Sequence, residues 1–344
     1  MIAPLLNRLL APRPLSDRET RAVVATLLSK ESTDIERAGV LVALASRSPT
    51  AAELTGFIRE MQRRALPFPI PPGDRPIDLC GSGGARTGSF NVSTVSAFVV
   101  AASGIPVLKH GNRSARGPCG SRDLLEALGL PVTTSLGFAR ATYRRVRLAF
   151  LHAPLYHPAT RAVVAVRKVL AIPTLFNQLG PLSNPAPVAY QLLGVPDAPA
   201  ARRAIEVLRR LGRRRAMAVT SVEGCDEFSP KRETIAFLWT GRRVYRRTVD
   251  ARQVLPPEDR RGSWGPLPAE AAAEEARRIL AGGGGARRGS VLLTAGAAVW
   301  LAGGARRLGD GIRTAREALD SGKAEEILEE MTRIAARFRS HGEV

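Results

Sequence analysis

The chain has 344 residues, 44% of them hydrophobic, which predicts two domains of roughly 100 to 200 residues with a large buried core. Its formal net charge is +20, from 51 Lys and Arg against 31 Asp and Glu, so its surface should attract phosphate-bearing molecules. No apolar run is long and uncharged enough to cross a membrane, and the N-terminal residues lack a secretory signal pattern. We therefore expect a cytoplasmic protein.

Cysteine and histidine usage argues against a zinc enzyme. Cys80, Cys119 and Cys225 stand singly, without the paired spacing of metal sites or the even number of a disulfide framework. The histidines lack the i, i+4 pairing that metallohydrolases use. We expect reduced thiols and no zinc site.

Three amphipathic helices are predicted before residue 66. Each segment opens with Ser or Thr and acidic residues and continues with apolar residues at spacings of three and four, which is typical of a capped helix. The segments are 15–30, 32–48 and 48–65. The proline-rich stretch 66–76 cannot continue a helix. We therefore predict a helical domain, 1–70, joined by a later segment near 170–190, and a larger domain, 71–344.

Strand-like apolar runs alternate with longer amphipathic segments after residue 70. This alternation is typical of βαβ units, so we predict an α/β fold with a mainly parallel central sheet and helices packed against it. Strands are predicted at 76–80, 105–111, 147–154, 187–195, 215–221 and 233–239; helices are predicted at 95–104, 121–130, 290–304 and 311–338, and a loop at 280–289.

A glycine-rich polar loop follows the first predicted strand. It reads GSGGARTGSFNVST, from Gly81 to Thr94, and places Asn91, Ser93 and Thr94 at the start of a helix. Converging backbone N–H groups and a helix N-terminus favour bound phosphate. The pattern matches neither the P-loop nor the dinucleotide-binding fingerprint, so by itself it fits a simple tight turn equally well.

A second polar loop, KHGNRSARGPCGSRD, begins at Lys109 in the next predicted strand. The carboxyl ends of neighbouring parallel strands meet at one edge, so both loops should face one crevice. Together they resemble the anthranilate phosphoribosyltransferases, whose loops read Gly-Thr-Gly-Gly-Asp followed by Asn-x-Ser-Thr, and Lys-His-Gly-Asn-Arg. The resemblance continues through 151–186, 224–230 and 295–304 and covers nearly the whole chain.

The resemblance implies a small helical domain beside a phosphoribosyltransferase-like α/β domain, and a homodimer formed through the helical part. It also implies Mg²⁺-dependent transfer of a phosphoribosyl group from 5-phosphoribosyl 1-diphosphate to anthranilate, a step of tryptophan biosynthesis. Displacing diphosphate requires no protein nucleophile, and we assign no general base.

Three groups of site residues follow from the resemblance. The diphosphate would be bound by Gly81, Ser82, Gly83, Gly84, Asn91, Ser93, Thr94 and Lys109. The aromatic acceptor would be bound by His110, Asn112, Ala153, Pro154, Tyr156, His157, Arg167 and Pro181. Magnesium would be held by Ser93, Asp226 and Glu227, whose hard oxygen atoms suit this cation. A guanidinium such as that of Arg167 suits a carboxylate in fork geometry.

Several loop residues depart from the family pattern. They are Ala85, Arg86, Arg116, Gly117, Pro118 and Arg122. They remove a carboxylate near the metal, add cations that could neutralise diphosphate or block the pocket, and stiffen a closing loop. Two alternatives therefore stay open: a diverged phosphoribosyltransferase or phosphorylase-like enzyme with another aromatic acceptor, and a non-catalytic nucleic-acid-binding relative on the same fold.

Arginine runs carry much of the positive charge. They lie at 209–215, 242–247 and 260–261. Aromatic residues make up only 5% of the chain and are not interleaved with these runs, so a stacking platform for single strands is poorly supported. We interpret the runs as solvated surface.

Overall fold

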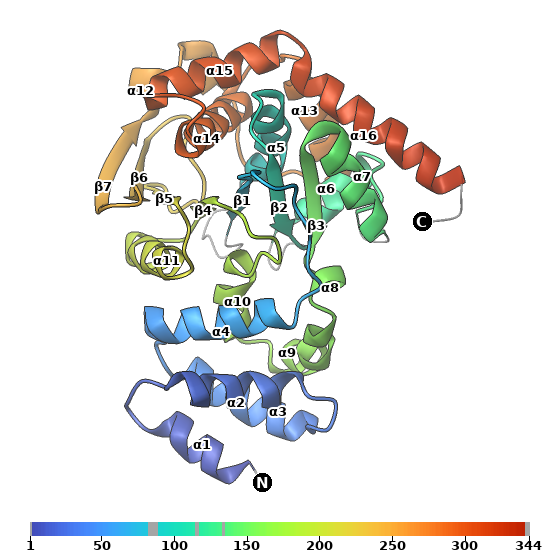
Figure 1. The fold of residues 1–344 in the computed structure, drawn as a ribbon. Helices are drawn as coiled ribbons and strands as arrows, with labels where there is room; N and C mark the ends of the chain where they lie inside the picture. Colours follow the sequence, from blue (N-terminus) through green and yellow to red (C-terminus); the bar gives the residue numbers. More distant parts are fainter. Residues whose placement is uncertain (1, 82–88, 114–116, 133–134, 341–344) are drawn as a thin grey trace.

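The computed structural model describes residues 2–81, 89–113, 117–132 and 135–340, which form a helical bundle next to a seven-stranded sheet covered by helices (Figure 1). The bundle begins with α1 (Ala3–Leu10), α2 (Asp17–Leu28), α3 (Asp34–Ala45) and α4 (Ala51–Arg63). Three of these helices confirm the segments predicted before residue 66. The proline-rich stretch after them contains no helix.

Local capping explains why three of these helices were predictable. Ser16, Thr33 and Thr50 each accept a hydrogen bond from the backbone N–H three residues on, where a Glu bonds back to the cap. These reciprocal bonds satisfy backbone N–H groups that a helix start leaves free. The sequence analysis missed α1, because its N-cap, Ile2, makes no side-chain cap bond.

A later part of the chain packs against the bundle. It contains α8 (Ala153–Tyr156), α9 (Val164–Leu170), α10 (Leu175–Leu179) and two short 3₁₀ helices, Pro158–Val163 and Gly180–Leu182. Its apolar side chains share one buried cluster with α2, α3 and α4. This packing supports the predicted joining segment, although the exact division of the chain at residue 70 stays a prediction.

The sheet has the strand order β3-β2-β1-β4-β5-β6-β7. The first five strands in this order are parallel, and β6 runs antiparallel to both of its neighbours, β5 and β7, which is consistent with a mainly parallel α/β fold. Gly81 pairs with Gly194 and Gly111 pairs with His152, so the carboxyl ends of four strands lie at one edge. The strands are β1 (Ile77–Gly81), β2 (Val107–Gly111), β3 (Leu148–His152), β4 (Tyr190–Gly194), β5 (Arg215–Ser221), β6 (Glu233–Trp239) and β7 (Val244–Asp250).

The edge strand β7 was not predicted. Its sequence, VYRRTVD, was interpreted only as a surface arginine run. Only Val249 is buried in it, so the apolar alternation that marks a strand is almost absent. Charged side chains on an edge strand also discourage pairing with other chains, which explains why such a sequence is tolerated there.

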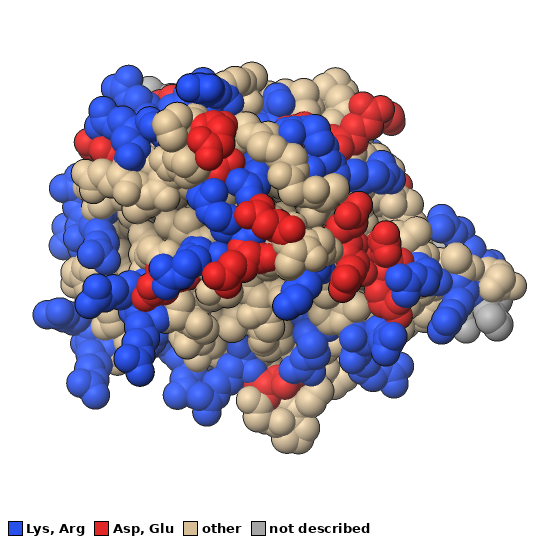
Figure 2. All heavy atoms as spheres, turned by 90° about the horizontal axis from the view of Figure 1, so that it is seen from above, with Lys and Arg blue, Asp and Glu red and all other residues tan. Residues whose placement is uncertain are grey.

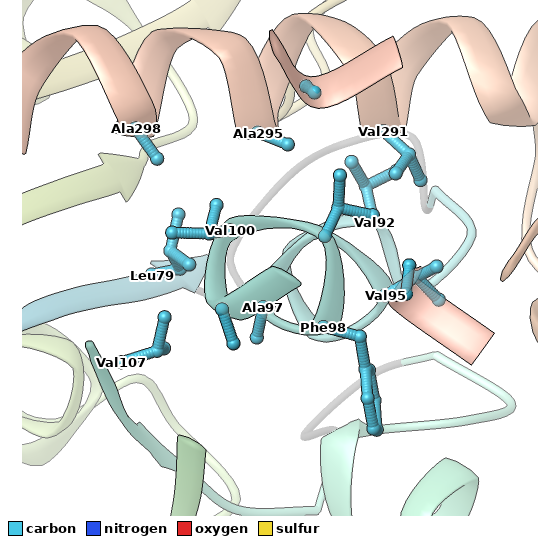
Figure 3. Close-up of a cluster of buried hydrophobic side chains, with 14 of the residues drawn as sticks. Leu79, Val92, Val95, Ala97, Phe98, Val100, Val107, Val291, Ala295 and Ala298 are labelled. Atoms are coloured by element: carbon cyan, nitrogen blue, oxygen red, sulfur yellow. The ribbon is translucent and has the colours of Figure 1, made fainter. Parts of the chain in front are cut away.

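The core lies between the sheet and the helices α5 (Val92–Ala102) and α14 (Ala286–Ala302). Figure 3 shows α5 between α14 and the strands β1 and β2, with Leu79 and Val107 facing it from the strands. Ten of the eleven residues of α5 are buried, which suits a helix covered on all sides. The remaining helices over the sheet are α6 (Ser121–Ala127), α7 (Leu136–Val146), α11 (Ala198–Arg210), α12 (Ala251–Val254), α13 (Ala269–Leu280), α15 (Leu308–Asp320) and α16 (Lys323–Ser340), with a 3₁₀ helix at Pro257–Arg260.

Two predicted segments differ from the structure. The loop predicted at 280–289 is shorter, because α14 begins at Ala286. The closing segment 311–338 is divided into α15 and α16 by a turn in which Gly322 has a φ of 77°. Within the described ranges no helix is long and apolar enough to cross a membrane.

Candidate active site

The site is built at the carboxyl edge of the sheet, where β1 and β4 meet the segment after β5. A β-carbon added to Gly194 would lie only 1.6 Å from the carbonyl oxygen of Asp226, so this position admits only glycine. A β-carbon added to Gly81 would lie 3.2 Å from Oδ2 of Asp226 and 3.8 Å from Oε1 of Glu227. The two predicted metal-binding carboxylates therefore face the end of β1, directly beside the first predicted phosphate loop.

Lys109 and Ser93 meet at the same place. The Lys109 ammonium, on β2, donates to the carbonyl oxygen of Leu79 at 2.6 Å and to Oγ of Ser93 at 3.2 Å. Ser93 is in the first turn of α5, and both side chains are buried. Burial lowers the pKa of Lys109, while the negative charge of Glu227 opposes that change. A cation, a hydroxyl and two carboxylates thus converge from three separate parts of the chain.

The Glu227 carboxyl group is buried beside a second carboxylate. Burial, followed by the negative charge of Asp226, raises the pKa of Glu227 to about 8. Two adjacent buried carboxylates and a hydroxyl are hard oxygen ligands, and Mg²⁺ commonly combines one or two carboxylates with substrate phosphates. The donor set therefore fits magnesium. Among the residues that the structure describes, no group of three or more His, Cys, Asp or Glu that could hold a metal by itself occurs.

The two predicted loops are tied to each other by hydrogen bonds. Nδ2 of Asn91 donates to the carbonyl oxygen of Cys119 at 3.1 Å, and Oγ1 of Thr94 donates to Oγ of Ser121 at 3.0 Å. Ser121 begins α6 and was not among the predicted site residues. The sequence signal that could have identified Ser121 is its place directly after Gly120, at the point where the second loop ends and α6 begins. The bonds show that the two loops lie side by side.

His110 lies next to Lys109 and faces His157. The two rings meet edge to face with centroids 5.3 Å apart. Burial, and then the proximity of His157, lowers the pKa of His110 to about 3, so its ring is neutral. Nε2 of His157 donates to the carbonyl oxygen of Ser183 at 2.9 Å, which fixes its tautomer. Nε2 of His110 is buried and has no hydrogen-bond partner among the described residues, which singles it out as a buried polar atom that the protein leaves unsatisfied.

A buried polar network lies beneath these residues, and sequence reasoning missed it. The Asp78 carboxylate accepts the backbone N–H of His110 at 3.1 Å and Nε2 of Gln191 at 3.2 Å. Oε1 of Gln191 in turn accepts Nε of Arg213 at 3.2 Å. Burial raises the pKa of Asp78 to about 6, although Lys109 and other partners oppose it. No local pattern pointed to Asp78, because it stands inside an ordinary strand sequence.

The remaining predicted acceptor residues are less closely gathered. Ala153, Pro154 and buried Tyr156 follow β3, and Pro181 lies before β4 and accepts Nε2 of Gln191 through its carbonyl oxygen. Asn112 is exposed after β2.

Arg167 donates to Oγ1 of Thr174 at 3.1 Å, and its guanidinium lies 5.2 Å from the ring of Phe176. Among the described contacts, none joins Arg167 to the histidine pair or to Lys109. The role of Arg167 in acceptor binding therefore stays a prediction.

Some of the divergent loop residues can be located. Arg122 lines a small cavity of about 10 Å³ with Lys109, Ser121 and His152, and its Nε donates to Glu126 at 3.0 Å. Gly117 and Pro118 are exposed. The predicted diphosphate residues Ser82, Gly83 and Gly84, and the departures Ala85, Arg86 and Arg116, lie outside the described residues.

Comparison with known families matches both parts of the chain. A model described as "Glycosyl transferase family, helical bundle domain" matches residues 3–65, and one described as "Glycosyl transferase family, a/b domain" matches residues 73–325. The chain is 39% identical over 335 residues to the anthranilate phosphoribosyltransferase of Synechococcus sp. (strain JA-3-3Ab), covering 96% of this chain and 97% of that protein. It is 38% identical over 323 residues to the corresponding protein of Shouchella clausii, covering 93% and 94%.

Solved structures show the same likeness. The anthranilate phosphoribosyltransferase of Thermus thermophilus superimposes with a TM-score of 0.84 at 34% identity, covering 96% of this chain and 99% of that chain. The Saccharomyces cerevisiae enzyme, solved in complex with PRPP and Mg, superimposes with a TM-score of 0.83 at 24% identity, covering 98% of each chain. The second likeness concerns the fold alone.

Proposed function

Because the chain belongs to the anthranilate phosphoribosyltransferase family, we propose that it transfers the phosphoribosyl group of 5-phosphoribosyl 1-diphosphate to anthranilate and releases diphosphate. The observation that carries the proposal is the convergence of Lys109, Ser93, Asp226 and Glu227 at the end of β1. The reaction belongs to tryptophan biosynthesis. We place it in the cytoplasm, a location supported by the three free cysteines.

The reaction exchanges one bond at the anomeric carbon of the sugar. The bond from this carbon to the diphosphate oxygen breaks, and its electron pair leaves with diphosphate. The lone pair of the anthranilate amine forms the new carbon–nitrogen bond, and the amine then loses a proton to solvent. Positive charge develops on the sugar and negative charge on the leaving group, so catalysis consists mainly of positioning and of stabilising the leaving group.

Residues of the two loops would bind the leaving diphosphate. The Lys109 ammonium already approaches Ser93 at the N-terminus of α5, where the helix dipole favours negative charge. Asn91 and Thr94 border the same crevice through their bonds to the second loop. Gly81 leaves the space beside the carboxylates open. Roles for Ser82, Gly83 and Gly84 stay predictions from the family pattern.

Ser93, Asp226 and Glu227 would hold magnesium. When bound, this cation neutralises charge on the diphosphate oxygens. The raised pKa of Glu227 supports the assignment, because a buried carboxylate pair without a cation favours a proton instead. Lys109 lies on the other side of Ser93 and would complete the positive surroundings of the leaving group.

The acceptor would bind beside the histidine pair. The neutral ring of His110 presents an unpartnered Nε2, and His157 supports that ring from its edge. Ala153, Pro154, Tyr156 and Pro181 would line the approach. Asn112 would orient the amine, and Arg167 would pair with the carboxylate in fork geometry.

We also propose a homodimer formed through the helical part. Large apolar side chains are exposed on α1, α3 and α9, and Ile35 and Val169 are each 85% exposed. The others on these helices are Leu10, Val42 and Val164, and Ile172 is exposed just after α9. Exposed apolar patches of this kind mark association surfaces. Light scattering should give twice the chain mass, and Ile35→Asp combined with Val169→Asp should produce a monomer.

Loss of anthranilate fluorescence on mixing with 5-phosphoribosyl 1-diphosphate and Mg²⁺ tests the activity directly. Diphosphate release should match the loss of anthranilate in equal amounts. Glu227→Gln should abolish turnover while leaving the thermal midpoint near that of the parent. Diphosphate release with another aromatic amine, but not with anthranilate, would reassign the acceptor. No turnover over a broad range of both substrates would reject the proposal.

A further inference from the structure

The fold brings the end of α11 and the β6–β7 turn together at the amino edge of the sheet, so two distant arginine runs become neighbours. Nε1 of Trp239 donates to the carbonyl oxygen of Arg213 at 2.9 Å, and a β-carbon at Gly241 would lie 3.0 Å from the carbonyl oxygen of Arg214. The end of α11 and the β6–β7 turn are therefore neighbours. We name the combined surface the arginine patch; its members are Arg209, Arg210, Arg214, Arg215, Arg242, Arg243, Arg246 and Arg247.

Few carboxylates neutralise the positive charge of the patch. All eight side chains are exposed, and Arg209 and Arg210 share one carboxylate, that of Glu206. Within the described residues, the other six guanidinium groups form no ion pair with a carboxylate. Figure 2 shows, from above, Lys and Arg crowding the side of the molecule on which Figure 1 draws β7.

Acidic residues of the same strand pair lie far from the arginines of the turn, Arg242 and Arg243, although Arg247 is only three residues from Asp250. Glu233 pairs with Asp250 at one end of the β6–β7 ladder, and Trp239 pairs with Val244 at the other. Six residue steps at about 3.3 Å each separate these ends by about 20 Å. This distance exceeds the screening length of about 8 Å at physiological salt.

The patch is also separate from the active site. Arg215 begins β5, whereas the candidate carboxylates follow the end of this strand, beyond Ser221. A strand of seven residues spans about 20 Å. Arg247, farther along β7, is in register with Gly194 through Ala236 and Val219, but β7 lies three strands from β4, about 14 Å at about 4.8 Å per strand. The charge of the patch needs an explanation other than the transferase reaction.

A groove in the helical bundle adjoins the patch. It has a volume of about 540 Å³ and runs between α2 and α4. Nη2 of Arg59 donates to the carbonyl oxygen of Arg210 at 2.8 Å, so one side chain belongs to the groove and touches the patch. The groove is lined by Asp17, Arg21, Gly56, Arg59, Gln62 and Arg63. Arg59 therefore connects the groove to the end of α11, and three of the six lining residues of the groove are arginines.

We propose that the arginine patch and this groove together bind single-stranded nucleic acid through its backbone phosphates. Guanidinium groups match phosphate in fork geometry, and a flexible strand can follow the surface from the hairpin end into the groove. A single strand can follow such a surface without the bending energy that a stiff duplex requires. A lipid surface would require several inserting apolar side chains, whereas in the β6–β7 hairpin Val244, at 42% exposure, is the large apolar residue exposed to solvent.

Fluorescence anisotropy with a labelled oligonucleotide of about 20 thymidines tests the proposal. Six neutralised phosphates predict a slope of log K against log salt of about −4, or a ~250-fold loss of affinity between about 50 and about 200 mM salt. The variant R242Q/R243Q/R246Q/R247Q should weaken binding at least about tenfold at low salt and reduce the slope by about 3.

The matched control is R144Q/R277Q/R306Q/R307Q, which removes the same charge from exposed positions on other helices and loops. It should bind the oligonucleotide like the parent, and both variants should keep parental anthranilate turnover. Equal weakening by the two variants would show attraction by net charge alone and reject the patch. No binding at about 50 mM salt, or binding only to vesicles of phosphatidylglycerol and phosphatidylcholine, would also overturn the proposal.

Discussion

Gly194→Ala tests the geometry on which the candidate site depends. In the structure, an added β-carbon would lie 1.6 Å from the carbonyl oxygen of Asp226, whereas real β-carbons stay at least 3.0 Å from such atoms. The segment carrying Asp226 and Glu227 must therefore move by about 1.4 Å, or β4 must move away from β1, with which Gly194 pairs at Gly81.

Both the stability and the chemistry should respond. Overpacking of this kind costs about 1–3 kcal/mol, and at about 2–4 °C per kcal/mol the thermal midpoint should fall by roughly 2–12 °C. A displacement of about 1 Å at a reacting centre can cost ~100-fold in rate. We therefore expect kcat/KM for anthranilate to fall ~100-fold, with a higher Mg²⁺ requirement, because the displaced residues are the proposed ligands.

The assay combines thermal unfolding with anthranilate fluorescence at varied Mg²⁺. Gly309→Ala is the control, because a β-carbon there would meet no heavy atom within 4 Å and the residue lies in α15, on the surface. This control should keep parental turnover and gain a few tenths of a kcal/mol from helix propensity. Parental stability and parental Mg²⁺ dependence in Gly194→Ala would refute the placement of the Asp226 segment against β4.

Three further predictions concern other residues. The pKa of Glu227 is about 8, so below this pH Mg²⁺ must displace a proton in order to bind. The apparent Mg²⁺ affinity should therefore rise about tenfold per pH unit from about pH 6 to about pH 8 and stay constant above that. Burial and the Arg122 guanidinium hold the pKa of His152 at about 4, so Arg122→Gln should raise it, as measured by NMR titration. Ala171 ends α9 with a φ of 50°, so Ala171→Gly should stabilise the chain by ~1 kcal/mol in urea unfolding.

Each of these predictions has a contradicting result. A flat Mg²⁺ affinity from acid to neutral pH would show that Glu227 is not the titrating ligand, whereas Glu227→Gln should lose the pH dependence altogether. An unchanged His152 titration in Arg122→Gln would place the guanidinium away from that ring. A less stable Ala171→Gly would mean that flexibility in the unfolded chain outweighs the relieved backbone conformation.

Most local elements could be predicted from short stretches of the chain. Ser16, Thr33 and Thr50 cap their helices through residues three positions away, so a short window contains the whole interaction. Buried strands such as β1 and β5 were visible as apolar runs. The strand β7 was not visible in this way, because an edge strand needs few apolar side chains. Its arginines hide the alternation of apolar and polar residues that marks a strand.

The candidate site could be described only by combining the sequence pattern with the tertiary structure. The family pattern pointed to Lys109, Ser93, Asp226 and Glu227, but only folding brings them to the end of β1. The close approach of Asp226 to Gly194 depends on the order of strands in the sheet, which no local window contains. The same holds for Asp78, whose partners lie far away along the chain.

The arginine runs show most directly what the sequence determines and what only the tertiary structure decides. Composition predicted a basic surface, yet it could not tell whether 209–215 and 242–247 are neighbours. Antiparallel pairing of β5 with β6 makes them so, because it returns the chain to the amino edge where α11 ends. Charge is a property of single residues, whereas a charged surface depends on distances that only the folded chain defines.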